Sequence, residues 1–151
     1  MKLSRKEIGR LGETLAAEYL KNNGLIIIET NYRCPCGEID IIAQQDDCIV
    51  FTEVRTKTGN KFGTPEESVT NTKKKHLIET AYTYLDEKDK LQVNWRIDFI
   101  AVELDRNNKP ARIEHYRDAV YAKIILILFV DRFIGMVCSN DKECITEPGG
   151  R

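Results

Sequence analysis

Two apolar segments separated by a short polar turn constrain the fold more than any other feature of the sequence. The first covers residues 38–43 (EIDIIA), and the second covers residues 48–55 (CIVFTEVR). The residues between them read QQDD, which is a composition typical of turns. Two β-rich runs joined in this way predict an antiparallel hairpin, so we expect the chain to build a sheet around it.

A helix is predicted ahead of the hairpin. Ser4 and Glu7 have the spacing of a capping box, and apolar residues follow at helical intervals until Asn23-Gly24 ends the pattern. The other expected elements are a strand at residues 25–28, a helix that starts at Thr64-Pro65 and ends near Leu85, and strands at residues 95–104 and 112–116. The order is α-β-β-β-α-β-β, which predicts an α+β (mixed α/β) domain with helices flanking a mixed central sheet.

The charge balance excludes a protein that coats nucleic acid by bulk charge. The 151 residues include 23 Lys and Arg against 24 Asp and Glu, a net charge of −1. Locally, however, residues 55–75 hold six basic and two acidic residues, a net charge of +4. The six are Arg55, Lys57, Lys61, Lys73, Lys74 and Lys75. Such a segment suits contacts with phosphates, although a lysine run can also be a solvated helix face.

Acidic side chains lie on the apolar faces of the predicted hairpin. If the four turn residues stay unpaired, Ala43 faces Cys48, and Asp40 and Glu53 become diagonal neighbours within reach of one cation. Carboxylate oxygens suit Mg²⁺ or Mn²⁺. Glu13 on the first helix has small neighbours that would let a metal or a nucleic-acid strand approach. The alternative stays open that Glu13 is solvated, Glu53 pairs with Arg55 and Asp40 caps a turn.

Cysteine usage favours a reducing compartment. The five cysteines are odd in number and their spacings fit no disulfide framework, so we expect reduced thiols and a cytoplasmic protein. A zinc site built from Cys34, Cys36, Cys138 and Cys144 is a weaker alternative, because the spacings within both pairs are unusual for zinc.

Read in order, several short motifs resemble the YraN-like family of uncharacterised bacterial proteins. That family is in turn similar to the archaeal Holliday-junction resolvases of the PD-(D/E)XK nuclease superfamily, which have a restriction-endonuclease-like core. The resemblance covers about residues 5–120. It is carried by Gly9-x-x-Gly12-Glu13-x-x-Ala16, Asn31-x-Arg33, residues 37–43 (GEIDIIA), Phe51-x-Glu53-Val54-Arg55, Gly63-x-Pro65-x-x-Ser68-Val69-Thr70, Lys73, Arg96-Ile97-Asp98 and Ile113-Glu114-His115.

The resemblance implies metal-dependent hydrolysis of phosphodiester bonds. It implies that Asp40 and Glu53 bind the metal and that Glu13 completes the site. The expected cofactor is Mg²⁺ or Mn²⁺. Arg55 stands where the superfamily has a lysine, and an arginine cannot act as a general base. Arg55 would instead stabilise charge on the phosphorus, or Lys57 would substitute for the lysine. Lys57, Lys73, Lys74 and Lys75 are the expected nucleic-acid contacts.

Three further expectations concern residues outside this set. Asp98 is predicted to pair with Arg96, and His76 and His115 are read as lone histidines. Residues 121–151 form a C-terminal extension beyond the nuclease-like domain of residues 1–120. Its apolar run at residues 124–130 is too short to span a membrane, which takes about 20 residues, so core packing or a homodimer is expected.

Three functions therefore compete at this point. The leading one is a nuclease-like, nucleic-acid-binding protein that acts as an endonuclease, structure-selective on DNA. The second is a non-catalytic nucleic-acid-binding module that retains the fold. The third is an interaction protein that works through its apolar C-terminal tail.

Overall fold

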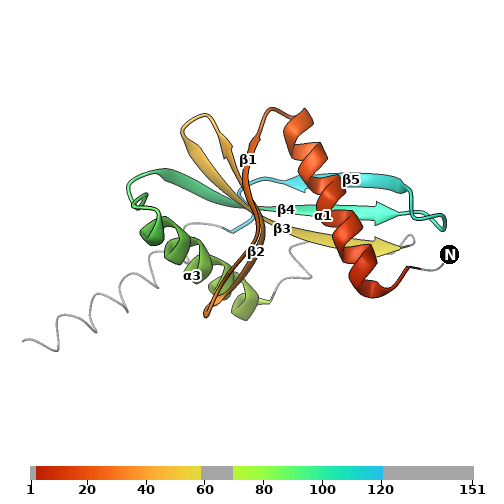
Figure 1. Ribbon diagram of the computed structural model, residues 1–151, viewed down its shortest axis with the longest axis horizontal. Coiled ribbons are helices and arrows are strands. Elements are labelled where there is room, and N and C mark those ends of the chain that lie inside the picture. The colour runs from red at the N-terminus through yellow and green to blue at the C-terminus, as the bar shows by residue number, and fades with distance from the viewer. Residues whose placement is uncertain (1–2, 59–69, 121–151) are drawn as a thin grey trace, which may run out of the picture. The chain divides into compact units, whose positions relative to one another are not determined.

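The structure is a computed structural model that describes residues 3–58 and 70–120, all within one compact unit. Within these residues, a five-stranded sheet is flanked by two helices (Figure 1). The elements are α1 (Arg5–Asn22), β1 (Ile26–Cys34), β2 (Gly37–Gln45), β3 (Cys48–Thr58), α3 (Asn71–Glu87), β4 (Asn94–Leu104) and β5 (Pro110–Tyr116). The predicted order, α-β-β-β-α-β-β, and the α+β class with a mixed sheet are confirmed, and they agree with a restriction-endonuclease-like core.

The sheet runs in the order β1-β2-β3-β4-β5. Three of its pairings are antiparallel, and the β3–β4 pairing is parallel. Parallel neighbours cannot be joined by a tight turn and need a crossover connection. The chain between β3 and β4 contains α3, which packs beside β2 (Figure 1).

The two helices cover opposite faces of the sheet. Successive side chains of a strand point to opposite faces, and Val50 and Phe51 are successive residues of β3. Val50 belongs to the buried cluster that includes Ala16 and Leu20 of α1. The ring of Phe51 lies 5.7 Å from that of Tyr84 on α3 in an edge-to-face contact. Glu53, two residues after Phe51 on β3, can therefore be assigned to the face that α3 covers.

Helix α1 begins and ends where its sequence predicts. Ser4 and Glu7 form the expected capping box, and the chain leaves the helix through Asn23 and Gly24, with Gly24 at φ 84°. Midway along, α1 crosses β3 so closely that a Cβ on Gly12 would lie 1.7 Å from Oγ1 of Thr56. Only glycine allows this approach, which places the next residue, Glu13, over the strand.

The predicted register of the β2–β3 hairpin is wrong by two residues. Gln45, and not Ala43, lies opposite Cys48, so Asp46 and Asp47 alone form the turn. Asp46 adopts a left-handed conformation, φ 50°, that aspartate tolerates in tight turns. Because strands have a period of two residues, the shift leaves every side chain on its predicted face.

Several element boundaries differ from the predictions. Strand β1 extends to Cys34 through a bulge between Ile27 and Glu29, because its polar middle still pairs with β2. Helix α3 ends at Glu87, two residues beyond the predicted end, and the described part of it begins at Asn71 after the N-cap residue Thr70. The predicted start at Pro65 lies outside the described residues.

The expectation that all cysteines are reduced is contradicted by a disulfide between Cys34 and Cys36. Cys34 ends β1 and Cys36 lies in the two-residue turn that leads to β2, and their Cα atoms are 5.3 Å apart, a distance that a disulfide spans without backbone movement. The pairing also removes two thiolates from the alternative zinc site. Cys48 is a free thiol, and Cys138 and Cys144 lie outside the described residues.

Within residues 3–58 and 70–120, no helix is long and apolar enough to cross a membrane. The proposed extension, residues 121–151, lies outside the described residues. The domain division at residue 120 and the homodimer therefore stay predictions.

Candidate active site

Asp40 lies at the point where the hydrogen-bonded ladder between β2 and β3 ends. The last paired residues are Ile41 and Thr52, and beyond them the Oδ2 atom of Asp40 accepts a hydrogen bond of 2.7 Å from the backbone N–H of Val54. Burial and then the charge of Glu53 raise the pKa of Asp40 to about 7, against the opposing effect of the Val54 hydrogen bond. The charge of Glu13 raises this pKa further.

Glu53 is the buried carboxylate of the site, at 4% exposure. Its Oε1 atom accepts a hydrogen bond from the ammonium group of Lys73, which reaches it from the first turn of α3. Nε of Arg55 lies 3.4 Å from the same oxygen, but it is buried and makes no hydrogen bond within the described part of the chain. Two cations therefore contact a single carboxylate oxygen.

A cavity of about 810 Å³ brings the predicted carboxylates together. Glu13 of α1, Asp40 of β2 and Glu53 of β3 all line it. The positively charged residues in its wall are Arg5, Arg55 and Lys57. The cavity thus joins acidic groups that suit a cation with basic groups that suit an anion.

Two charged residues of this wall, Arg5 and Glu38, were not predicted to belong to the site. Arg5 lies eight residues before Glu13, with Gly9 halfway, and residues spaced by four share one helix face. This spacing in the sequence could therefore have identified Arg5 as a residue on the same helix face as Glu13. Glu38 precedes Asp40 by two residues and so shares its strand face, but it is exposed and pairs with Arg33 at 3.5 Å.

The structure separates the four lysines predicted to contact nucleic acid. Lys57 is exposed and lines the cavity, whereas Lys73 contacts Glu53. Lys75 pairs with Glu79 on its own helix at 4.0 Å, and Lys74 is half-buried beside it. Lys61 of the positively charged segment lies outside the described residues. Lys57 and Lys73 are therefore the two that reach the candidate site.

The donor chemistry of the cavity fits a divalent cation. Asp40, Glu53 and Glu13 offer the hard oxygen ligands that Mg²⁺ and Mn²⁺ prefer, and the repulsion that raises the pKa of Asp40 is one that a cation would relieve. Among the residues that the structure describes, however, no three His, Cys, Asp or Glu side chains converge closely enough to form a ready-made metal site. The ammonium of Lys73, and not a second carboxylate, is the group placed against Oε1 of Glu53.

Asp98 does not join this cavity, and its predicted pairing with Arg96 is confirmed. Nε of Arg96 donates to both carboxylate oxygens of Asp98, at 3.0 and 3.1 Å. His115, which was predicted to be a lone histidine, places Nε2 2.8 Å from Oδ2, and the amide of Asp118 donates at 2.9 Å. Burial would raise the pKa of Asp98, but these hydrogen bonds outweigh it and lower the pKa.

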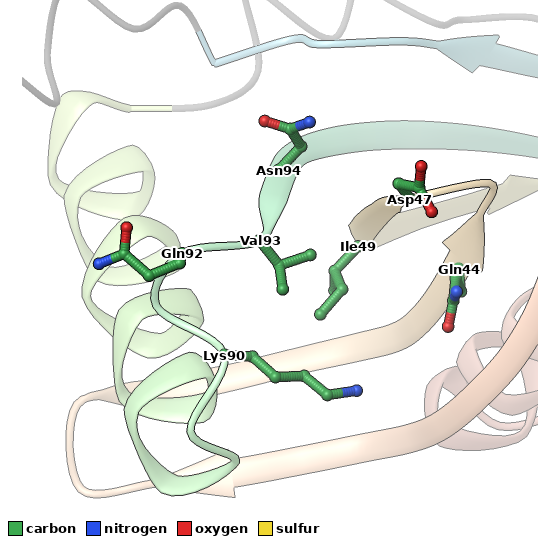
Figure 2. Close-up of a pocket in the computed structure, with 7 residues that line it drawn as sticks. All are labelled: Gln44, Asp47, Ile49, Lys90, Gln92, Val93 and Asn94. Carbon is green, nitrogen blue, oxygen red and sulfur yellow. The ribbon is translucent and has the colours of Figure 1, made fainter.

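A second cavity, of about 350 Å³, lies at the far end of the β2–β3 hairpin (Figure 2). Figure 2 shows its polar side chains, among them Gln44 and Asp47 from the hairpin and Lys90 and Gln92 from the loop after α3. None of the residues predicted to act in catalysis, metal binding or nucleic-acid binding lines it. The carboxylate cavity is therefore the candidate site.

Comparison with known proteins places the chain in a family. The model of the uncharacterised protein family UPF0102 matches residues 12–102, a range that contains Glu13, Asp40, Glu53 and Arg55. A UPF0102 protein of Dehalococcoides mccartyi is 49% identical over 120 residues, which make up 80% of this chain and 98% of the relative. UPF0102 proteins of Moorella thermoacetica and Pelotomaculum thermopropionicum are 44% and 42% identical, over 79% and 77% of this chain and 99% and 97% of their own. The resemblance to YraN-like proteins is thereby confirmed, and the chain belongs to the uncharacterised protein family UPF0102.

Proposed function

We propose that this protein is a metal-dependent endonuclease that hydrolyses phosphodiester bonds in nucleic acid, with DNA as the substrate. The observation that carries the proposal is the meeting of Asp40 and Glu53, from neighbouring strands, in a cavity that Glu13 also lines. These carboxylates would hold Mg²⁺ or Mn²⁺. A bound divalent cation lowers the pKa of a coordinated water and stabilises negative charge on a phosphate.

The basic residues in the wall of the cavity also support the proposal. Arg5, Arg55 and Lys57 line the cavity beside the carboxylates, so a phosphate that approached the metal would meet positive charge. An arginine side chain cannot serve as a general base, so Arg55 would act by electrostatic stabilisation. The acidic side chains would hold the metal that activates a water, and the basic side chains would face the negatively charged phosphodiester. This combination fits hydrolysis of a phosphodiester bond.

The test is cleavage of branched and linear DNA in Mg²⁺ or Mn²⁺. The wild-type protein is expected to cleave, with a preference for the branched substrate that the resemblance to junction resolvases implies. Asp40→Asn and Glu53→Gln are each expected to lower the rate by at least about 100-fold, the scale lost when one electrostatic group of an active site is removed. Glu38→Gln is the matched control, because Glu38 lines the same cavity but is exposed.

A non-catalytic nucleic-acid-binding module is the second candidate. The contact between Lys73 and Glu53 favours it, because a carboxylate already paired with a lysine has less need of a metal to balance its charge. This candidate predicts salt-sensitive DNA binding that weakens on Lys57→Glu, with no cleavage in any metal. Binding without cleavage would therefore replace the first proposal by the second.

A further inference from the structure

We propose that Lys73 is a resident counter-cation that competes with the metal for Glu53 and contacts the substrate phosphate once the metal has displaced it. The inference rests on the proposed function and deepens it. It gives Lys73, a residue of α3, a role distinct from the electrostatic one proposed for Arg55.

Lys73 and a bound metal would compete for the same carboxylate oxygen of Glu53. Lys73 donates to Oε1 of Glu53, the most buried of the three carboxylates that β2 and β3 contribute to the cavity. A divalent cation bound by Glu53 would bring a charge of +2 against this ammonium. Oε1 of Glu53 already contacts both Lys73 and Arg55, so a divalent cation at this oxygen would compete first with Lys73, the one of the two that is hydrogen-bonded to it.

The side chain of Lys73 can move, although its backbone is held in place. The backbone of Lys73 is fixed, because its N–H donates to Oγ1 of the N-cap residue Thr70 at 3.2 Å. Its ammonium, in contrast, ends a flexible four-carbon stem, and the side chain is 36% exposed. The charge can therefore leave Glu53 while the stem stays anchored beside the carboxylate. The side chain of Arg55 is exposed to a similar extent, 39%, but its Nε atom is buried beside Glu53.

Once displaced from Glu53, the ammonium of Lys73 would need another anion as its partner. Lys73, Lys74 and Lys75 occupy the start of α3, whose first turn has no acidic residue. Positive charge at a helix N-terminus is unfavourable unless an anion accompanies it. When the metal takes Glu53, the anion that remains for Lys73 is the phosphate of the substrate.

In the reaction itself Lys73 serves as a hydrogen-bond donor and takes no part in the proton transfers. The oxygen of water forms a bond to phosphorus, the ester P–O bond breaks, and the water gives up a proton to solvent while the leaving oxygen takes one. The products are a phosphomonoester and an alcohol. Lys73 donates hydrogen bonds to the non-bridging phosphate oxygens as their charge grows.

The decisive measurement is Mn²⁺ affinity of the full chain, determined by calorimetry. Removing the competing charge with Lys73→Met is expected to tighten Mn²⁺ binding by roughly tenfold, which corresponds to the loss of one charge-assisted hydrogen bond. The same variant is expected to cleave more slowly. Lys75→Met is the matched control, because Lys75 pairs with Glu79 and not with Glu53, and it should leave the Mn²⁺ affinity unchanged.

The outcomes separate this inference from the proposed function. Wild-type protein that binds Mn²⁺ and cleaves, together with unchanged or weaker Mn²⁺ binding by Lys73→Met, would overturn the role of Lys73 alone. Wild-type protein that binds no metal and cleaves nothing would overturn both. If Lys73→Met does not fold, the ¹³Cε resonance of Lys73 in the wild type provides the test. It should shift on addition of Mg²⁺ while that of Lys75 does not, and a Lys73 resonance that stays in place would contradict displacement.

Discussion

The carboxylate of Asp40 acts as a hydrogen-bond acceptor where β2 and β3 stop pairing. Its Oδ2 atom accepts a hydrogen bond of 2.7 Å from the backbone N–H of Val54, just beyond the last ladder pair, Ile41 and Thr52. A backbone donor that would otherwise lose its partner is thereby satisfied. The same bond holds Asp40 next to Glu53, which precedes Val54. One side chain thus closes the end of a hairpin and brings two carboxylates together.

This arrangement makes the stability of the protein depend on pH through Asp40. The pKa of Asp40 is raised from 3.8 to about 7, so the folded state holds a proton that the unfolded state has already lost. The free energy of unfolding, relative to that of Asp40→Asn, should therefore fall as the pH rises from about 4 to about 7. Urea unfolding of both proteins across this range measures the difference. Parallel pH profiles would contradict the raised pKa.

The close approach of α1 to β3 predicts opposite effects at two glycines. Gly12→Ala forces a Cβ into the side chain of Thr56 and should destabilise the protein by about 1–3 kcal/mol. At Gly9 of the same helix, an added Cβ would meet no atom of the described residues within 4 Å. Gly9→Ala should therefore be neutral or stabilise by about 0.5–1 kcal/mol. Chemical denaturation of both variants distinguishes the sites, and equal effects would show that α1 does not cross β3 at Gly12.

The N-cap of α3 should matter more than the helical residue that follows it by two positions. The Thr70 side chain accepts from the N–H of Lys73, so Thr70→Ala should cost about 1 kcal/mol of stability. Thr72 is exposed on the first turn, and Thr72→Ala is expected to change stability by less than about 0.5 kcal/mol. Thermal unfolding compares the two. A Thr72→Ala variant as unstable as Thr70→Ala would argue against this cap.

The buried network around Asp98 should be the most sensitive part of the core to loss of a charge. Asp98→Ala leaves the Arg96 guanidinium without its buried partner and is expected to cost about 3–5 kcal/mol. Because its pKa is lowered in the folded state, Asp98 contributes stability above its unfolded pKa of about 3.8, and this stability is lost as the pH falls further. The stability difference between wild type and Asp98→Ala should narrow in acid. A constant difference from pH 7 to pH 3 would refute the ionised state of Asp98.

The sequence predicted the neighbouring positions of Asp40 and Glu53 in spite of an incorrect register. The register was wrong because the turn was taken as four residues, whereas Asp46 and Asp47 suffice. An error of two residues matches the period of a strand, so the face of each side chain survived. Periodicity along a strand is a local property that a sequence contains.

Contacts made between elements were not accessible in the same way. The pairing of Lys73 with Glu53 depends on how α3 lies against the sheet, and that of His115 with Asp98 depends on the β4–β5 register. Neither is implied by spacing along one element. The disulfide between Cys34 and Cys36 was missed because the odd number of cysteines and their spacings were taken to indicate reduced thiols.

Anomalous diffraction from a crystal soaked in Mn²⁺ tests the central claim most directly. The account predicts a single strong anomalous peak between the carboxylates of Asp40 and Glu53, with the ammonium of Lys73 moved off Oε1. Density for Mn²⁺ at other sites only, with Lys73 still bonded to Glu53, would contradict a metal-dependent active site in this cavity.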